Sequence, residues 1–191
     1  MVDYLTLLPV AIAGYLIGSI PTGVILARVF GWDDPRTYGS GHTGSLNVGR
    51  RAGRVALVAV LLIDLLKGVA AVLLAPLISA SPWAVAVGGV MAVVGHCYPV
   101  WLRFKGGMGL ATGLGAILSQ NWLLGLIAAA LLAILRFAVI KHTPRASIAA
   151  ALLTIVAAAL MALPLPVFVL VLGVCGFITA RHMMDWNRKY N

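Results

Sequence analysis

The chain has 191 residues, of which 62% are hydrophobic and only 10% are charged. Soluble domains carry about 25% charged residues, so this composition excludes a soluble protein and favours one that crosses a membrane several times. Lysine and arginine total 14 against 5 acidic residues, which gives a net charge of +9. In a soluble protein this excess would suggest nucleic acid. In a membrane protein the loops beside the bilayer account for the cations, so we expect membrane lipid and no nucleic acid as partners.

Apolar stretches divide the chain into segments of about the length of a membrane crossing, which takes about 20 residues. They occupy about residues 4–30, 55–80, 83–102, 110–119, 122–140, 146–163 and 166–182. The stretch 110–119 is short, so it forms either one arm of a helical hairpin with its successor or a re-entrant segment. The sequence predicts an all-α, polytopic integral membrane protein with seven transmembrane helices, some short or re-entrant, in a single domain covering residues 1–191.

Among the connections between these stretches, only alternate ones carry basic residues. They lie in or beside the gaps after the first, third and fifth stretches and at the end of the chain, and they include Arg36, Arg50, Arg51, Arg54, Arg103, Lys105, Arg136, Lys141, Arg145, Arg181, Arg188 and Lys189. Loops rich in lysine and arginine face the cytoplasm. We therefore expect the N-terminus outside and the C-terminus inside.

The long polar segment at about residues 31–54 contains the run GSGHTGSLNVGR, from Gly39 to Arg50. Glycines let backbone N–H groups approach an anion closely, hydroxyl and amide side chains add donors, and arginines form paired hydrogen bonds with phosphate. The run lacks the GK[ST] ending of a Walker loop. We interpret it as a phosphate-binding loop, and a flexible cytosolic loop with membrane-flanking arginines is the alternative. The candidate residues are Arg36, Ser40, Gly41, Thr43, Asn47 and Arg50.

A second glycine-rich run, GHCYPVWLRFKGGMGLATGLG, extends from Gly95 to Gly115. Its proline, Pro99, is expected to end or kink the third helix. Glycines after Lys105 would leave the N–H groups of the next helix start uncovered, and a helix start beside a lysine attracts anions. This predicts a second anion site, with His96, Lys105, Gly106 and Gly107 as candidates. Close packing between helices is the alternative role for these glycines.

Three further groups of polar residues lie in or beside the apolar stretches. His182 and Asp185 are three residues apart and share a helix face, which suits an imidazole oriented by a carboxylate, although a structural histidine at a helix end fits equally. Asp64 and Lys67 lie deep in the second stretch and are either functional or an ion pair that joins helices. Ser147 either donates to phosphate or caps the sixth helix.

The remaining histidines and the cysteines show no metal-binding pattern. His42 and His142 have no ligand-like spacing around them, and Cys97 and Cys175 lie in or beside apolar runs. We therefore expect no metal site and no disulfide, and we expect both cysteines to be core residues.

These motifs together resemble the bacterial acyl-phosphate:glycerol-3-phosphate acyltransferases of the PlsY type. The matching runs are GSGHTGSLNVGR, DLLKG at Asp64–Gly68, GHCYPVWLRFKGGMGLAT, and Arg181-His182 followed by Asp185. The resemblance implies transfer of a fatty acyl group from acyl phosphate to the sn-1 hydroxyl of glycerol 3-phosphate, giving lysophosphatidic acid and phosphate without a cofactor. It also implies a bacterial cytoplasmic (inner) membrane location and an active site on the cytosolic side. His42, Met108 and Asp185 stand where the family pattern usually has Asn, Lys and Asn.

Two phosphorylated substrates need two anion sites, and the two glycine-rich runs could supply them. Phosphate leaves an acyl phosphate readily, so direct attack by the glycerol hydroxyl suffices, with the protein aligning the reactants and stabilising charge. The residues expected to act in catalysis are Lys105, Arg50, His182, Asp185 and His96, and those expected to bind phosphate are Arg36, Ser40, Gly41, Thr43, Asn47, Gly106, Gly107 and Ser147. The identity of the general base stays open, and the phosphate of glycerol 3-phosphate itself is one candidate. A small organic-anion or phosphate transporter and a structural membrane scaffold are the alternative functions.

Overall fold

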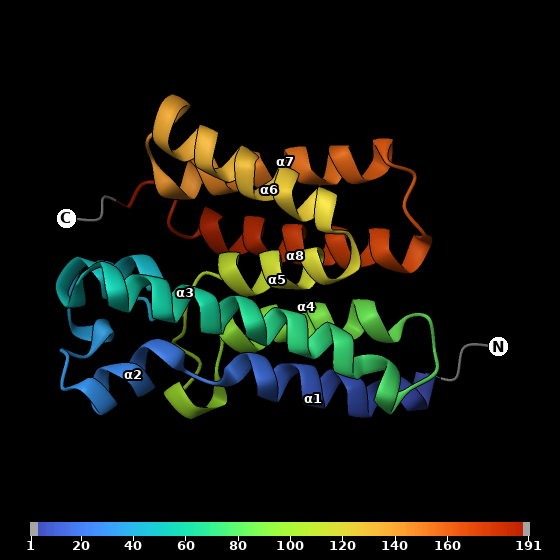
Figure 1. Cartoon of the computed structure of the whole chain (residues 1–191), viewed down its shortest axis with the longest axis horizontal. Helices are drawn as coiled ribbons and strands as arrows, with labels where there is room; N and C mark the ends of the chain where they lie inside the picture. Colours follow the sequence, from blue (N-terminus) through green and yellow to red (C-terminus); the bar gives the residue numbers. More distant parts are fainter. Residues whose placement is uncertain (1–3, 189–191) are drawn as a thin grey trace.

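The computed structural model describes residues 4–188, and over this range the chain forms helices and no strands. The main helices are α1 (Leu7–Ser19), α2 (Thr22–Phe30), α3 (Ser45–Ile78), α4 (Ala84–Cys97), α5 (Leu110–Gln120), α6 (Trp122–Ile134), α7 (Thr143–Leu160) and α8 (Leu165–Met183). Single turns of 3-10 helix occupy Tyr4–Thr6, Pro35–Thr37 and Val100–Leu102, and a π-helical turn at Leu135–Val139 extends α6. The long helices run side by side as a bundle (Figure 1). Lys189, which we expected among the basic residues of the C-terminal end, lies outside the described residues.

Within residues 4–188, six segments are long and apolar enough to cross a membrane. They are Leu7–Phe30, Ser45–Ile78, Ala84–Leu102, Trp122–Val139, Thr143–Leu160 and Leu165–Met183. A seventh apolar helix, α5, has 11 residues, so it extends about 16 Å, roughly half the thickness of a hydrocarbon core. The prediction of an all-α protein with several membrane-crossing helices is confirmed, whereas the number of crossings and the orientation of the termini stay predictions.

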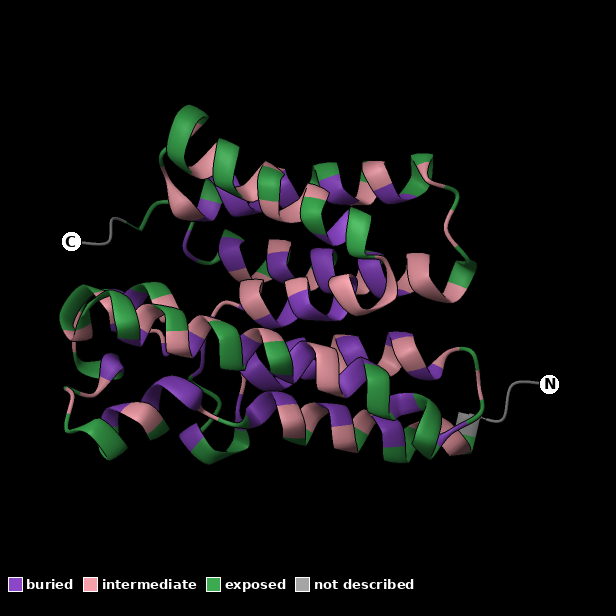
Figure 2. Ribbon diagram, viewed as in Figure 1, coloured by how far each residue is buried: buried purple, intermediate pink, exposed green. Residues whose placement is uncertain are grey.

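The outer faces of the bundle expose apolar side chains. On α3, exposed leucines follow a helical spacing of four and seven residues, at Leu62, Leu66, Leu73 and Leu77. Figure 2 shows such exposed residues along the outer faces of α3 and α6. Because water would penalise an apolar stripe of this length, lipid chains are its natural surroundings.

The first apolar stretch is divided into two helices at Pro21. We predicted one helix over residues 4–30, but α1 ends at Ser19 and α2 begins at Thr22. Proline has no N–H to continue the helical hydrogen-bond ladder. The ammonium of Lys67 compensates at this break, since it donates to the carbonyl oxygens of Gly18 and Ile20 at 3.2 and 2.8 Å.

The helix after the first glycine-rich loop begins at Ser45, ten residues earlier than predicted. The segment 45–54 had no apolar periodicity and was expected to be loop. It is helical up to a kink at Gly53, which has φ 86° and ψ −178°, a conformation accessible mainly to glycine. A Cβ atom on Gly49 would lie 2.7 Å from the Cβ of Leu57, so the short first part of α3 folds back onto the long second part.

Close contacts between small residues bring the inner helices together. Gly14 and Gly18 on α1 lie against the backbone of Gly88 and Ala92 on α4, where any side chain would clash. This is the small-xxx-small packing common between membrane helices. The largest buried apolar cluster is formed mainly by α4, α5, α7 and α8 and includes both cysteines, which are buried core residues as predicted.

The polar connections gather at one end of the bundle. Pro99 follows the end of α4, as predicted, and the chain then forms a short turn before α5 begins at Leu110. In Figure 1 the loop between α2 and α3, the connection between α6 and α7, and the end of α8 all lie on the left, opposite the N-terminus. The bundle thereby places the basic loops, which are distant in sequence, beside one another.

Candidate functional site

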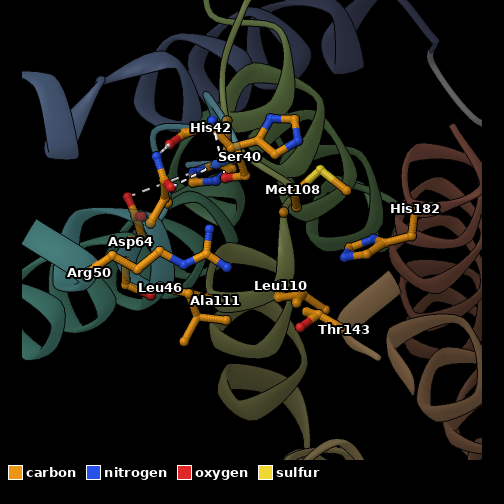
Figure 3. Close-up of a pocket in the computed structure, with 15 residues that line it drawn as sticks. Ser40, His42, Leu46, Arg50, Asp64, Met108, Leu110, Ala111, Thr143 and His182 are labelled. Atoms are coloured by element: carbon orange, nitrogen blue, oxygen red, sulfur yellow. Dashed lines mark hydrogen bonds and ion pairs between the residues drawn. The ribbon is translucent and has the colours of Figure 1, made fainter. Parts of the chain in front are cut away.

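An open cavity with an empty volume of about 650 Å³ lies at this polar end. It is lined from the loop before α3, from the starts of α3, α5 and α7, and from α4 and α8. The lining residues are Ser40, His42, Gly44, Ser45, Leu46, Asn47, Arg50, Asp64, His96, Met108, Gly109, Leu110, Ala111, Thr143 and His182 (Figure 3). The two glycine-rich runs, separated by more than 40 residues, therefore meet at one cavity.

Three helices begin at this cavity without a capping side chain. The N-cap residues are Gly44 for α3, Gly109 for α5 and His142 for α7, and none of their side chains accepts a hydrogen bond from the first turn. The N–H groups of a first helical turn have no partner within the helix, and the helix dipole adds positive potential there. Three such starts around one hollow make it an environment suited to an anion.

Asn47 organises the loop that carries the first glycine-rich run. Its side-chain amide donates to the carbonyl oxygens of Pro35 at 2.7 Å and His42 at 2.9 Å, and its oxygen accepts from the N–H of Ser40 at 2.9 Å. We predicted that Asn47 binds phosphate. Because the loop already uses its amide, we reassign Asn47 to holding Ser40 and His42 at the cavity wall.

Arg50 and Ser40, two of the predicted phosphate-binding residues, both line the cavity. The Arg50 guanidinium points toward the centre of the hollow (Figure 3). A Cβ on Gly39 would lie 3.0 Å from Arg50 Nη1, so the glycine leaves room for the arginine. Ser40 is buried, and its hydroxyl accepts a long hydrogen bond of 3.4 Å from the N–H of His42.

Three other candidates of the first run do not line the cavity. Arg36 forms two hydrogen bonds from Nε to Asp34, at 2.9 and 3.1 Å, and these hold the pKa of the Asp34 carboxyl below its usual value of 3.8. Thr43 is buried with its carbonyl against Gly23, and Gly41 forms a turn to Tyr38. The prediction that these residues contact phosphate is not supported, since their partners lie within the loop and in α2.

A buried polar cluster connects α3 with α4 beneath the cavity. Lys67 Nζ lies 2.8 Å from Asp64 Oδ1 and 3.3 Å from His96 Nδ1. The ion pair that we considered as the structural alternative is therefore present. An ammonium can only donate, so Nδ1 of His96 accepts and its hydrogen is on Nε2. Asp64 and His96 also line the cavity.

The glycines of the second run serve mainly in packing. The N–H groups of Gly106 and Gly107 donate to the carbonyl oxygens of Cys97 and His96, at 3.1 and 3.0 Å. Both glycines are buried against His96 and its neighbours, where a Cβ would clash. The N–H groups of these two glycines are therefore used within the chain. Phosphate binding near Gly106 and Gly107 stays a prediction that would depend on the uncapped start of α5. Lys105 is exposed and does not line the cavity, although Met108, three residues later, does.

His182 and Asp185 do not form the predicted pair. The ring of His182 is 1% exposed and its Nδ1 donates to the carbonyl oxygen of Ile178 at 2.9 Å. Its Nε2 is thereby left as an acceptor, and the ring points into the cavity (Figure 3). The helix ends at Met183, so Asp185 lies in the following turn. Its carboxylate instead accepts from His42 Nε2 at 2.7 Å.

Ser147 is also placed differently from either prediction. Because α7 begins at Thr143, Ser147 lies one turn inside the helix, where its hydroxyl donates to the Thr143 carbonyl at 2.9 Å. It does not cap the helix and does not line the polar cavity. Thr143 lines that cavity, and sequence reasoning missed it because the start of α7 was placed three residues too late.

A second, smaller cavity lies deeper in the bundle between α5, α6, α7 and α8. Its lining is almost wholly apolar and consists of Leu110, Gly113, Leu114, Ile117, Ala128, Ala129, Leu132, Ser147, Ala150, Ala151, Thr154, Cys175 and Ile178. Leu110 lines both cavities. The first cavity, which has Arg50 and other polar side chains in its lining and helix starts at its rim, is thus adjacent to an almost wholly apolar one. This arrangement suits an amphiphile with an anionic head.

The sequence and the fold are similar to those of known acyltransferases. A family model described as glycerol-3-phosphate acyltransferase matches residues 8–191. Curated proteins named glycerol-3-phosphate acyltransferase include one from Rubrobacter xylanophilus, 53% identical over 102 residues, and one from Jannaschia sp., 42% identical over 154 residues. The Jannaschia match covers 81% of this chain and 75% of the relative. The Rubrobacter match covers 53% of this chain and 51% of the relative, so the chain spans about half the length of that relative.

Two solved structures have the same fold. One is the glycerol 3-phosphate form of PlsY, an integral membrane glycerol 3-phosphate acyltransferase, with a TM-score of 0.84 and 32% identity. The other is the lysophosphatidic acid form, with a TM-score of 0.83 and 31% identity. Each match covers 95% of this chain and 90% of the solved chain.

Proposed function

We propose, since this chain belongs to the glycerol-3-phosphate acyltransferase family, that it transfers a fatty acyl group to the sn-1 hydroxyl of glycerol 3-phosphate. The products are lysophosphatidic acid and, with acyl phosphate as the donor, inorganic phosphate. The observation that carries the proposal is the convergence of three uncapped helix starts and Arg50 on one hollow. Glycerol 3-phosphate and the phosphate of the donor are both anions that such a hollow would attract.

The donor proposal is supported by the second cavity. An acyl phosphate has an anionic head and a long apolar tail. With the head at the polar cavity, the tail would extend past Leu110 into the space between α5, α6, α7 and α8. Because lipid chains are as apolar as this lining, the cavity would position the tail by its shape and would add little hydrophobic free energy.

We assign the reaction to direct attack of the glycerol hydroxyl on the acyl carbonyl carbon. The new ester bond forms as the bond between that carbon and the phosphate oxygen breaks, and phosphate leaves with the electron pair. Arg50 and the N–H groups of the helix starts would stabilise the charge on phosphate. His182 Nε2, fixed as an acceptor by the bond of Nδ1 to Ile178, would accept the hydrogen of the attacking hydroxyl and orient it. The proton then leaves on His182 or on a substrate phosphate.

Lys105 enters the proposal as a cation at the edge of the cavity. Its side chain is exposed and its backbone lies three residues before the lining residue Met108. A lysine side chain is flexible, so Lys105 can move onto a phosphate that occupies the hollow.

The location follows from the distribution of charge. The cavity lies at the end of the bundle that carries the basic loops (Figure 1). By the positive-inside rule that end faces the cytosol, where glycerol 3-phosphate is dissolved. We therefore propose that the protein resides in the bacterial inner membrane with its site on the cytosolic side.

One assay separates the proposed reaction from its main alternative. Purified protein in detergent is given acyl phosphate and glycerol 3-phosphate, alone and together, and released phosphate and lysophosphatidic acid are measured. We expect equal amounts of both products, formed only with both substrates present. An organic-anion transporter would instead release no phosphate and would take up glycerol 3-phosphate when reconstituted into vesicles, which would contradict the proposal.

A further inference from the structure

His42 and Asp185 connect two walls of the cavity that are far apart in sequence. His42 belongs to the loop before α3 and lines the cavity, and Asp185 lies in the turn just beyond α8. Nε2 of His42 is 2.7 Å from Oδ2 of Asp185, across 143 residues of chain. Because an ionised carboxylate can only accept, the imidazole donates this hydrogen bond.

The bond is shielded from water on both sides. The side chains of His42 and Asp185 are 13% and 8% exposed. A hydrogen bond to a charged group contributes more when it is shielded, because water competes less with the partners. By comparison, the ion pair between Asp33 and Arg51 in the same region of the chain has both side chains 59% exposed, and exposed pairs of this kind contribute little.

The backbone at each end of the bond is held by further hydrogen bonds. On the loop side, Asn47 holds the carbonyl of His42 and the N–H of Ser40. On the α8 side, the N–H of Asp185 donates to the carbonyl of His182 at 3.1 Å, and the N–H of Arg188 donates to Asp185 at 2.9 Å. The bond therefore joins two segments that are each fixed by hydrogen bonds of their own, so moving one of them would move the other.

The helices behind these segments are not packed directly on each other to any extent. Both α3 and α8 pack against α4 and α5, which lie between them. The distance between the Arg50 side of the cavity and the His182 side thus depends on the two intervening helices. It also depends on any direct contact between the loop before α3 and the turn after α8. His42–Asp185 is such a connection, three residues from His182 on one side.

We propose that the His42–Asp185 hydrogen bond is a latch that sets the distance between the Ser40 side of the cavity and His182 for acyl transfer. Neither residue touches the reacting atoms in this role, so both are positioning residues. This inference rests on the proposed acyltransferase function. Its consequence is that the latch acts through alignment, so breaking it lowers turnover more than it weakens the binding of either substrate.

The test is a double-mutant cycle measured on the purified full chain. The variants are His42→Ala, Asp185→Ala and the two combined, with kcat and KM for glycerol 3-phosphate measured by phosphate release. We expect each single variant to lose about 10- to 100-fold in kcat, as small misalignments do, with KM changed less than about threefold. The double variant should lose no more than the worse single variant, because the same bond is broken in all of them.

Two further variants separate alignment from general damage. Gln in place of His42 places an amide donor near the position of Nε2, so His42→Gln should retain kcat within about threefold of wild type. Asp33→Ala removes an exposed acidic partner in the same loop and should leave kcat unchanged. Single variants with wild-type kcat, or losses that multiply in the double variant, would overturn the latch.

Failure of the proposed function has a different signature. If the wild-type protein releases no phosphate, the acyltransferase assignment is overturned, and the pairing itself is then decided by the thermal midpoints of the same four proteins without substrate. Non-additive losses in midpoint support the His42–Asp185 connection, and additive losses overturn it.

Discussion

Lys67 Nζ lies 2.8 Å from Asp64 Oδ1 in the interior of the bundle, and the two side chains are 5% and 3% exposed. Removing one member of a buried ion pair leaves an uncompensated charge, which costs about 3–5 kcal/mol. Lys67→Met should therefore lower the thermal midpoint strongly, and it also removes the donors to the carbonyls of Gly18 and Ile20.

The matched control for this prediction is the double variant Asp64→Asn with Lys67→Met. The double variant also lacks the lysine, but it has no unpaired carboxylate, so it should unfold at a higher temperature than Lys67→Met alone. A double variant that is less stable than the single one would show that the pair is not what holds α3 in place.

Gly107 should not tolerate a side chain. A Cβ there would clash with Nε2 of His96 and lie 2.9 Å from its Cδ2, so the ring would have to turn away from Lys67. We expect Gly107→Ala to reduce both thermal stability and acyl transfer. The control is Gly176→Ala on α8, where nothing lies within 4 Å, and alanine favours a helix by up to about 1 kcal/mol over glycine. Equal behaviour of the two variants would contradict this packing.

Arg50 should contribute to phosphate binding through its charge. A hydrogen bond to a charged group contributes about 1.5–3 kcal/mol, so Arg50→Ala should lower kcat/KM for glycerol 3-phosphate by about 10- to 100-fold while the protein stays folded. Arg54→Ala, an exposed arginine outside the cavity lining, is the matched control and should stay near wild type. A larger loss of kcat/KM in Arg54→Ala than in Arg50→Ala would contradict the role assigned to Arg50.

Leu110 should control the passage of the acyl chain, since it lines both cavities. Leu110→Trp fills space between them and should reduce turnover of long-chain acyl phosphates at least several-fold more than that of short-chain ones. Leu126→Trp, on the exposed face of α6, should show no such difference. Parallel losses for long and short donors in the Leu110 variant would argue against the proposed tail site.

The stability of the protein should fall in acid partly through His42. Burial lowers the pKa of His42 below its ordinary value of 6.5, more than its hydrogen bond to Asp185 raises it, and the nearby cations Arg181 and Arg188 lower it further. The unfolded chain therefore binds this proton at a higher pH than the folded one. Stability is fully present above about pH 6.5 and declines as the pH falls toward the folded pKa.

His42→Gln isolates this contribution, because glutamine does not titrate in this range. Thermal midpoints of both proteins measured from pH 7.5 to pH 5 should show a steeper loss for wild type than for the variant. Identical slopes would mean that His42 binds its proton equally well in the folded and unfolded chains.

Much of the fold could be predicted from the sequence because lipid imposes strong constraints. Apolar stretches such as 146–163 and 166–182 correspond to α7 and α8 within a few residues. The failures occur where single residues override periodicity. Pro21 divides the first stretch because it lacks a backbone N–H. The helix start at Ser45 was missed because the kink at Gly53 interrupts the apolar pattern.

For the site, the sequence predicted which segments meet but not what each side chain does there. The two glycine-rich runs do line one cavity. The roles of Asn47 and Gly107 depend on contacts with Pro35 and His96, distant or folded-back partners that no local pattern specifies. Similarly, the spacing of His182 and Asp185 suggested a pair on one helix face, whereas the end of α8 at Met183 directs Asp185 to His42.

The central claim is that the cavity bounded by the starts of α3, α5 and α7 binds glycerol 3-phosphate. It is tested most directly by cysteine labelling in the purified protein, since Cys97 and Cys175 are buried, at 0% and 3% exposure, and should react slowly. Met108→Cys places a thiol in the cavity lining, and Thr37→Cys places one on an exposed part of the same end of the bundle. Saturating glycerol 3-phosphate should slow maleimide labelling several-fold at position 108 and leave position 37 unchanged. Equal labelling rates at position 108 with and without glycerol 3-phosphate would contradict the claim.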